Sequence, residues 1–495
     1  MMHLVRNKLI KLSCAVLLCA CISGCTNAGG GDSDTGSVRV WLSNPAGGVW
    51  LTQQSSTDFS TSSESADATV RVVPSTQYQT MDGFGASMTE SSAYLMKTYL
   101  DEDELKEVCE NLFGADGIHI TLLRQPMGAS DFSLTAWTYD DTDDNSADEN
   151  LGNFSLDHED TYIRPMLTLA YECSPGDLRL MATPWSPPAW MKTGLNLYGS
   201  SGGSLDEDYY DAYAEYFVKF LEAYKTAGTP VYAVTVQNEP EYAAPYPGMV
   251  MSASEQAAFI DVLAEKLAGS DVNSTLILGF DHNYDSLTYA ETVLSSEASN
   301  AAGTAFHYYS SDLSHSNLTT LHDEYPDEGI WATECGTGTW IGSGADTGMF
   351  LDIMMHTIRF PRNYAKSYIT WNVALDQNGV PKLDSTSSTN IGLVTIRSNV
   401  RNSVTYTNTY YGLGHTSKFV SPGAVRIYSD SGSEATSNST DNSDRIETCA
   451  YKNTDGSIAL VLLNSYEASK NVKVKYNGEW FVYTVPAQSA VTFTW

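Results

Sequence analysis

The sequence predicts an α/β protein: a (β/α)8 TIM barrel with an accessory β-sandwich domain built from both chain ends. Two observations support this. Within the 495 residues, eight short apolar segments recur, each followed by a polar loop and usually by a helical stretch, whereas both ends of the chain read as strands alone. Near-continuous apolar strands that alternate with helices are typical of a parallel sheet, and eight of them indicate a closed barrel.

The eight expected barrel strands share an apolar stretch that ends in polar residues. They are Gly83–Gly85, Ile118–Leu123, Leu178–Ala182, Val231–Val236, Leu276–Phe280, Ala305–Tyr308, Ile330–Thr333 and Ser367–Trp371. The segments between them carry helix signals. Ser252 with Glu255 three residues later is a capping box, and apolar residues at helical spacing predict a helix over Asp208–Ala227.

The chain ends predict the second domain. Strands are expected before the barrel and again after about residue 420, where Asn453–Gly456 and Asn477-Gly478 are typical hairpin turns. We therefore assign residues 38–80 to the N-terminal strands of this domain, residues 81–415 to the catalytic barrel and residues 416–495 to the C-terminal β-sandwich.

The first residues differ from the rest of the chain. A basic stretch precedes an apolar run that is too short to span a bilayer, and the run ends in Ile22-Ser23-Gly24-Cys25. This resembles a bacterial lipobox, so residues 1–24 are expected to be a lipoprotein signal peptide, Cys25 the lipidated residue and residues 25–37 a flexible tether. The expected protein is exported and lipid-anchored at the cell membrane or outer surface; the alternative is a secreted protein.

Composition narrows the class of ligand. There are 60 acidic residues against 27 basic ones, a net charge of −33, which disfavours nucleic acids and leaves neutral ligands such as sugars. The acidity also suits the solubility of an exported protein. Cysteines outside the leader are far apart, and no cluster of His or Cys suggests a metal. We expect no metal, no cofactor and no obligate protein partner, and contact with a membrane only through the lipid anchor.

Two carboxylates follow directly on apolar strands. Glu239 comes after the fourth strand, in Gln237-Asn238-Glu239-Pro240, and Glu334 comes after the seventh. In a β/α barrel the chemistry lies at the carboxyl ends of the strands, so both side chains are expected at one mouth. Two carboxylates that flank a sugar, with tryptophans nearby, are the equipment for glycoside hydrolysis.

The same segments resemble a known family. The motifs MDGFGASMTESSA, LLRQPMGASDFS, ATPWSPPAWMKT, VTVQNEP, FHYYS, WATECGTGTW and TWNVALD are similar to those of glycoside hydrolase family 30, from about Tyr78 to the C-terminus. The family fold is a β/α barrel with a side β-domain formed from both chain ends. Its members include glucosylceramidases, β-1,6-glucanases, β-glucosidases and xylanases.

The resemblance implies a role for each matching residue. Glu239 matches the general acid/base, Glu334 the nucleophile of a retaining double displacement, and Asn238 the residue that binds the sugar 2-hydroxyl. Arg124 matches an arginine near the nucleophile, Tyr309 a donor to the same carboxylate, and His307 a histidine beside it. Asp131, Trp185 and Trp371 match the lining of the glucose subsite.

The substrate is left open by the sequence. A β-linked glucan, most readily β-1,6-glucan, suits an exported lipoprotein; glucosylceramide is the alternative, and a glycan-binding lipoprotein without activity is the alternative of another class. The loop Asn378–Leu393 is expected to shape the leaving-group side. The acidic loop Asp140–Glu149 is a solvated loop or a calcium site, and Trp190 and Trp340 are packing residues or part of the rim.

Overall fold

A computed structural model gives the fold of the chain. It describes residues 36–61, 65–174, 176–296, 300–309, 314–336, 338–341, 345–430 and 445–495. The expected signal peptide 1–24, Cys25 and most of the tether lie outside the described residues. Within the described ranges, no helix has both the length and the apolar character needed to cross a membrane.

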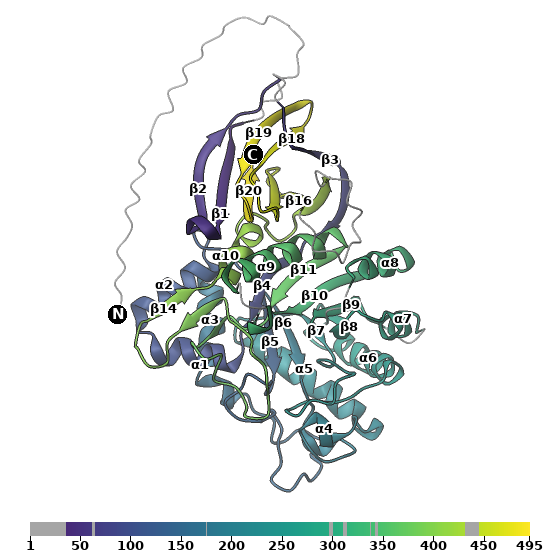
Figure 1. Cartoon of the computed structure of the whole chain (residues 1–495). Helices are drawn as coiled ribbons and strands as arrows, with labels where there is room; N and C mark the ends of the chain where they lie inside the picture. Colours follow the sequence, from purple (N-terminus) through teal and green to yellow (C-terminus); the bar gives the residue numbers. More distant parts are fainter. Residues whose placement is uncertain are drawn as a thin grey trace, which may run out of the picture. The chain divides into compact units, whose positions relative to one another are not determined.

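Eight parallel strands close into a barrel in the part of the chain that the structure describes, as the sequence predicted (Figure 1). Around the barrel the order is β10-β11-β4-β5-β6-β7-β8-β9. The strands are β4 (Gly83–Ser87), β5 (Leu122–Met127), β6 (Arg179–Pro184), β7 (Val231–Thr235), β8 (Leu276–Asn283), β9 (Gly303–Tyr308), β10 (Gly329–Cys335) and β11 (Ala365–Thr370). This order is that of a (β/α)8 barrel, in which each strand pairs with the next along the chain.

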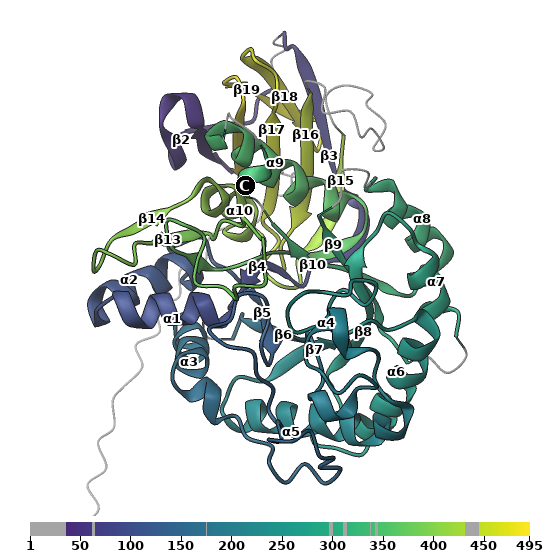
Figure 2. The same ribbon diagram turned by 60° about the horizontal axis from the view of Figure 1, so that its bottom comes forward.

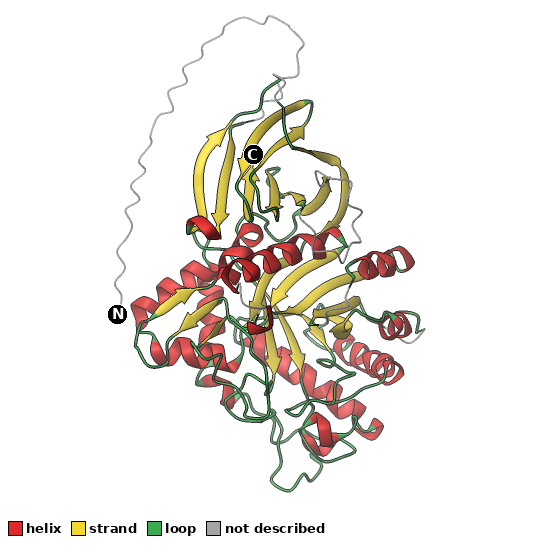
Figure 3. Cartoon of the chain, viewed as in Figure 1, coloured by secondary structure: helices red, strands yellow, loops and turns green. Residues whose placement is uncertain are grey.

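Helices surround the barrel strands, as Figures 2 and 3 show. They are α1 (Glu90–Tyr99), α2 (Glu102–Phe113), α3 (Ile163–Cys173), α4 (Gly199–Gly202), α5 (Tyr210–Thr226), α6 (Ala253–Ala268), α7 (Thr288–Leu294), α8 (Ser316–Glu324), α9 (Ala345–Arg362) and α10 (Asn408–Ser417). The predicted capping box is present, because Ser252 accepts from the Glu255 amide and the Glu255 carboxylate accepts from the Ser252 amide.

Two details of the barrel differ from the sequence prediction. The second strand begins at Leu122 rather than Ile118, because the amides of Ile118 and Ile120 donate to carbonyls at the end of α2 and His119 adopts a left-handed φ of 51°. A small sheet of β12 (Ala374–Leu375), β13 (Val394–Ile396) and β14 (Val404–Tyr406) follows the barrel and was not predicted. Its strands are too short to show a period-two pattern.

The interior of the barrel is a packed core. Leu122, Met181, Ala233, Leu278, Ala305, Trp331 and Ile369, from seven of the strands, form one buried cluster. A glycine is required where β4 approaches β5, because a Cβ on Gly85 would lie 1.6 Å from the Leu122 carbonyl oxygen. The interior is therefore closed to ligands, and the barrel presents its chemistry at the strand ends.

The second domain is a nine-stranded sheet in the described residues, in the order β19-β18-β3-β15-β16-β17-β20-β1-β2. Both chain ends contribute, as predicted. The N-terminal strands are β1 (Val38–Asn44), β2 (Val49–Thr57) and β3 (Ala68–Thr80), and the C-terminal strands are β15 (Val425–Ser429), β16 (Ile446–Lys452), β17 (Ile458–Asn464), β18 (Lys470–Tyr476), β19 (Glu479–Val485) and β20 (Ser489–Thr494). The two groups join where β1 pairs with β20 and where β3 pairs with β15 and β18. Phe481 of β19 packs 5.0 Å from Phe493 of β20, although these strands are not neighbours in the sheet. The sheet therefore folds over on itself as a sandwich.

The sandwich contacts the barrel through α9 and α10. His415 of α10 bonds to Ser43 Oγ of β1 and Thr492 Oγ1 of β20, at 2.8 and 2.9 Å. Arg359 of α9 forms a bidentate pair with Glu447 of β16, at 2.7 and 2.9 Å. These contacts tie both chain ends to the barrel.

Candidate active site

The predicted site residues come together at the carboxyl ends of the barrel strands. Arg124 lies in β5, His307 in β9 and Glu334 in β10, while the others follow β5, β6, β7, β9 or β11 directly or in the next loop. Seven of the nine line one cavity of about 250 Å³: Asp131, Trp185, Asn238, Glu239, Tyr309, Glu334 and Trp371. Arg124 and His307 are fully buried beneath it.

The two carboxylates lie close together. One oxygen of Glu239, one oxygen of Glu334 and one ring nitrogen of His307 all lie within 4.8 Å of one another. Glu334 forms a buried ion pair with Arg124 and accepts a hydrogen bond of 2.9 Å from the Tyr309 hydroxyl. These are two of the contacts that the sequence resemblance implied for Glu334.

Glu239 has different partners. Its backbone is left-handed, with a φ of 45°, and its amide donates to the Asp281 carbonyl at 3.0 Å. An αL conformation is uncommon for glutamate and clusters at functional sites. Its carboxylate lies 3.1 Å from His307 Nδ1, so His307 hydrogen-bonds to Glu239 and not to Glu334.

Arg124 organises the floor of the site. It is completely buried, and besides Glu334 it donates to Asn238 Oδ1 at 2.8 Å and to Asp281 Oδ2 at 2.9 Å. Its guanidinium lies 4.9 Å from the Trp185 ring and 5.7 Å from the Trp371 ring. Arg124 therefore fixes the amide of Asn238, the carboxylate of Glu334 and two aromatic walls at once.

The aromatic wall is built from distant loops. The rings of Trp185 and Trp371 stack at 5.3 Å and 23°, and Phe132 supports Trp371 from the side at 6.2 Å. Asp131 lies in the same cavity, and its Oδ2 accepts from Thr386 at 3.4 Å. Flat aromatic surfaces next to polar groups suit the C–H faces and hydroxyls of a sugar.

Family models match both domains. The model described as "Glycosyl hydrolase family 30 TIM-barrel domain" matches residues 81–443, and "Glycosyl hydrolase family 30 beta sandwich domain" matches residues 423–493. The chain belongs to glycosyl hydrolase family 30. It is thus a glycoside hydrolase, and the fold and enzyme class predicted from the sequence are confirmed.

Individual family 30 relatives are similar over most of their length. The chain is 31% identical over 432 residues to the endo-1,6-beta-D-glucanase neg1 of Aspergillus fumigatus, which covers 84% of this chain and 85% of that protein. It is 31% identical to the lysosomal acid glucosylceramidase of Mus musculus, over 85% of this chain and 82% of that one. The solved structure of the endo-beta1,6-glucanase BT3312 superposes with a TM-score of 0.82 at 31% identity, covering 93% and 99% of the two chains.

The carboxylates of this family 30 enzyme titrate as a coupled group. Burial alone would raise the pKa of Glu239, but the hydrogen bond and charge of His307 outweigh burial and lower it. Burial raises the pKa of Glu334, and the charge of Glu239 adds to this while His307 and Arg124 oppose it. Burial would lower the pKa of His307, yet the charges of Glu334 and Asp281 raise it to about 9. In the free site, the raised pKa of His307 favours its protonated ring, whereas the lowered pKa of Glu239 favours its carboxylate.

The pKa of Asp131 differs from that of an exposed aspartate. Burial raises it well above the ordinary value, and the charges of Glu334 and Glu239 raise it further. Asp131 therefore binds a proton more readily than an exposed aspartate does.

Several lining residues were not identified from the sequence. Tyr242, Pro245 and Tyr246 follow Glu239 in the loop after β7, and Thr386–Ser388 and Asn390 come from the loop that was expected to shape the leaving-group side. Asp281, at the end of β8, is fully buried below the cavity and was also missed. The only sequence signal for it was its position directly after an apolar strand.

The structure gives different roles to the two tryptophans, Trp190 and Trp340, that the sequence left open. Trp190 is 1% exposed and its indole N–H donates to the Asp140 carbonyl at 2.9 Å, so it packs the core. Trp340 is 51% exposed and lies 6.5 Å from the ring of Tyr309 at the edge of the site. Trp340 is thus a rim residue.

The site chemistry argues against a cation at the carboxylates. Glu239, His307 and Glu334 are near enough to share a metal ion, but His307 already uses both ring nitrogens, with Nδ1 on Glu239 and Nε2 on Asp281. Arg124 already supplies a positive charge to Glu334. In the acidic loop, both Asp141 oxygens accept from Thr138 and an Asp148 oxygen accepts from Asn153, so these carboxylates brace the loop's own turns.

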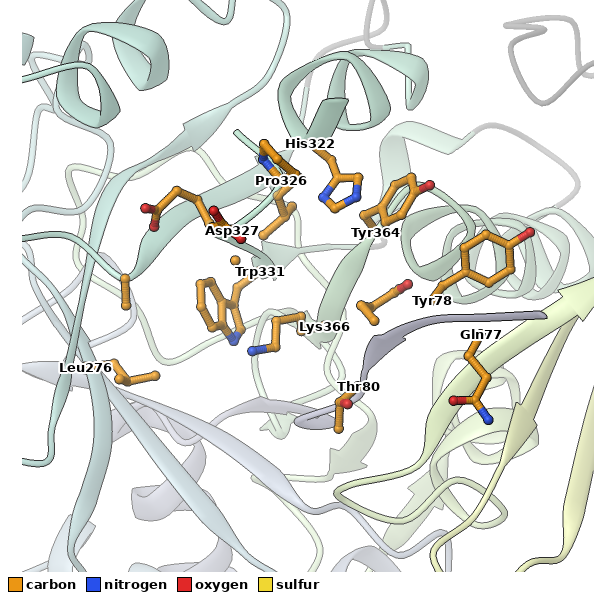
Figure 4. Close-up of a pocket in the computed structure, with 15 residues that line it drawn as sticks. Gln77, Tyr78, Thr80, Leu276, His322, Pro326, Asp327, Trp331, Tyr364 and Lys366 are labelled. Carbon is orange, nitrogen blue, oxygen red and sulfur yellow. The ribbon is translucent and has the colours of Figure 1, made fainter. Parts of the chain in front are cut away.

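A larger cavity of about 650 Å³ lies at the opposite, amino ends of the barrel strands (Figure 4). Its aromatic faces are covered by cations or rings. Arg426 lies 3.5 Å from the Tyr78 ring, His322 stacks 3.7 Å from Tyr364, and Lys366 lies 4.7 Å from Trp331. These rings are already engaged by cations or by another ring, and the two carboxylates lie in the smaller cavity at the carboxyl ends, so that cavity is the candidate active site.

Proposed function

We propose that this family 30 hydrolase cleaves β-1,6-linked glucan with retention of configuration, with Glu334 as nucleophile and Glu239 as acid/base. The observation that carries the mechanism is the approach of the two carboxylates to within 4.8 Å. Retaining enzymes place their carboxyl groups about 5–5.5 Å apart, whereas inverting enzymes leave about 6.5–9.5 Å for a water molecule. The short approach of one Glu239 oxygen to one Glu334 oxygen therefore supports retention over inversion.

The proposed reaction consists of two displacements. In the first, a Glu334 oxygen attacks the anomeric carbon while Glu239 protonates the glycosidic oxygen, which leaves with the electron pair of the broken C–O bond. In the second, Glu239 takes a proton from water, the resulting hydroxyl attacks the anomeric carbon, and Glu334 leaves as a carboxylate. Asn238 lines the same cavity and is held by Arg124 at 2.8 Å, which supports its proposed role as a donor to the sugar 2-hydroxyl.

The choice of glucan over glucosylceramide is supported by the cavity lining, because relatives of both kinds are about equally similar to this chain, at 31% identity. Endo-1,6-glucanases of Aspergillus fumigatus, Neurospora crassa and Trichoderma harzianum are 30–31% identical to this chain. The described residues that line the cavity include no Leu, Ile, Val or Met; they are aromatic, acidic, hydroxyl or amide side chains and one proline. A ceramide would need apolar surface for its hydrocarbon chains, and this lining suits a second sugar better.

Hydrolysis of defined substrates tests the proposal. Linear β-1,6-glucan, β-1,3-glucan, β-1,4-glucan and glucosylceramide in detergent should be compared by product analysis, with the first product observed by proton NMR. We expect turnover of the β-1,6-glucan and a β-anomeric first product. A faster reaction on glucosylceramide would contradict the substrate assignment, and an α-anomeric first product would contradict retention.

Azide rescue separates the two glutamates. In Glu334→Ala, azide should attack the glycone directly and give the α-glycosyl azide; in Glu239→Ala, it should attack the glycosyl-enzyme and give the β-glycosyl azide. Glu241→Gln is the matched control, because Glu241 lies two residues beyond Glu239 with a side chain that is 55% exposed, and this variant should keep activity. The opposite pattern of azides would exchange the two roles.

We further infer export and lipidation at Cys25, on the lipobox-like sequence before it. Metabolic labelling with a radioactive fatty acid in a bacterial host should label the wild-type chain and not Cys25→Ala. Equal labelling of the two proteins, or none in either, would contradict the anchor and favour a secreted enzyme.

A further inference from the structure

One buried carboxylate joins the two halves of the active site. Asp281 is fully buried, and its Oδ1 accepts from His307 Nε2 at 3.0 Å and from the Thr333 hydroxyl at 2.6 Å. Its Oδ2 accepts from Arg124 at 2.9 Å and from the Thr235 hydroxyl at 2.6 Å. Arg124 also forms the ion pair with Glu334, and His307 also hydrogen-bonds to Glu239. Asp281 is therefore one residue removed from both catalytic candidates.

The hydrogen-bond pattern fixes where the protons lie. Burial would raise the pKa of Asp281, but Arg124 and His307 outweigh it and hold the pKa well below its ordinary value. Asp281 is therefore ionised and can only accept, so His307 carries a proton on Nε2. The contact of 3.1 Å between His307 Nδ1 and Glu239 Oε1 then needs one further proton, which the two groups share.

We propose that Asp281 is a positioning residue that, through His307, stores the proton Glu239 gives to the leaving oxygen and recovers from water. This inference rests on the proposed retaining function and adds to it a named proton store. Membership of the family does not require such a proton store, because Glu239 alone would suffice as acid/base.

The cycle balances in protons and charge. Before reaction, the shared proton lies on His307 Nδ1 and Glu239 is ionised. As Glu334 bonds to the anomeric carbon, the proton crosses to Glu239 and on to the glycosidic oxygen, leaving neutral His307 and a Glu239 carboxylate. When water attacks, Glu239 takes the proton of water and His307 recovers it, while Glu334 leaves with its negative charge.

Transfer is coupled to the charge on Glu334. The charged or titratable groups around His307 are Glu239, Asp281, His282, Tyr309, Glu334 and, beyond Asp281, Arg124. Among them, the charge of Glu334 raises the pKa of His307 more than the charge of Asp281 does. When Glu334 becomes an ester that charge disappears, and His307 binds the proton less tightly at the step that consumes it.

A leaving-group series tests the proposal in Asp281→Asn. Aryl β-glycosides of the glycone that the wild type accepts should be compared, from phenyl to 2,4-dinitrophenyl, because only poor leaving groups need the proton. We expect kcat/KM to fall about 10–100-fold for the phenyl glycoside, since general acid catalysis contributes about 10²–10⁴-fold, and to change little for the dinitrophenyl one. The alkaline limb of the pH profile should move to lower pH, because the shared proton loses a neighbouring negative charge.

Asp82→Asn is the matched control. Asp82 is also a buried barrel carboxylate, and it accepts from Arg179, Tyr232 and Trp331 at the opposite end of the barrel, beside the cavity of Figure 4. The Asp82→Asn variant should be less stable than the wild type, but any loss of kcat/KM should be the same for all leaving groups. Equal losses on all leaving groups in Asp281→Asn, with an unmoved alkaline limb, would overturn the proposal while leaving the proposed function intact. Absence of wild-type turnover on every β-glycoside would instead refute the proposed function.

A second measurement needs no variant at position 281. The imidazole nitrogens of His307, assigned with His307→Gln, can be observed by 15N NMR in the free wild type and after trapping Glu334 with a 2-deoxy-2-fluoro glycoside. We expect an imidazolium in the free enzyme at neutral pH and a neutral ring, with its proton on Nε2, in the trapped form. An unchanged protonation state would overturn the proposal.

Discussion

Removing the charge of Arg124 should show how the site keeps Glu334 ionised. Arg124→Met keeps most of the length of the side chain but removes the positive charge that Arg124 places beside Glu334 and Asp281. Breaking a buried ion pair by deleting one partner costs about 3–5 kcal/mol. Arg124 is completely buried and the Glu334 side chain is 7% exposed, so solvent relieves little of this cost.

The cost can be converted into a titration shift. One pKa unit corresponds to about 1.36 kcal/mol, so a cost of about 3 kcal/mol that is relieved by proton uptake at Glu334 raises its pKa by about two units. Since the proposed nucleophile must be ionised to attack, the acidic limb of kcat/KM should move to higher pH by about that amount. Each unit between the assay pH and the new limb should lower the rate about tenfold.

The assay is the pH profile of kcat/KM on an activated aryl glycoside, with circular dichroism to show that the variants fold. Arg124→Lys retains the charge and loses the planar fork, so its limb should move less. Arg179→Met removes a different arginine, paired with Asp82 at the other end of the barrel, and should leave the limb in place. A folded Arg124→Met enzyme with an unchanged acidic limb would refute the reasoning.

Two further predictions concern stability. Burial lowers the pKa of His415 to about 3, so the unfolded chain binds a proton that the folded chain refuses between about pH 6.5 and 3. The free energy of unfolding should therefore fall as the pH falls through this window, by about 2 kcal/mol from pH 6.5 to 5. In His415→Asn, urea titrations should show that this contribution of His415 to the pH dependence is gone. An equal pH dependence in the variant and the wild type would contradict this. Gly85→Ala places a Cβ 1.6 Å from the Leu122 carbonyl oxygen, so this variant should fail to fold or should unfold at a urea concentration that is lower by several molar. In Gly228→Ala the new Cβ meets no atom within 4 Å, so only the strain of its φ of 83° should lower stability. Similar urea midpoints in the two variants would contradict the steric argument.

The catalytic candidates could be predicted because they follow a periodic feature. Glu334 lies near the end of β10 and Glu239 follows β7 by four residues, and in a closed barrel all such strand ends meet at one mouth. The sequence also indicated the two-ended sandwich, because alternating strands with hairpin turns stood at both termini. It misplaced the start of β5, because hydrogen bonds from Ile118 and Ile120 back to α2 are tertiary contacts that no local pattern records.

Asp281 escaped prediction for a related reason, and the reason bears on how this site works. Its residue type is common and its neighbours carry no distinctive motif, so its importance lies in four donors that come from β5, β7, β9 and β10. Phe280 and Asp281 also adopt left-handed φ values of 66° and 73°, as Glu239 does at 45°. Such strain persists only where the surroundings over-determine the backbone. The Glu239 amide, which follows β7, donates to the Asp281 carbonyl in β8 and so joins these strained residues. The same backbone contact therefore orients both the proposed acid/base and the proposed proton store.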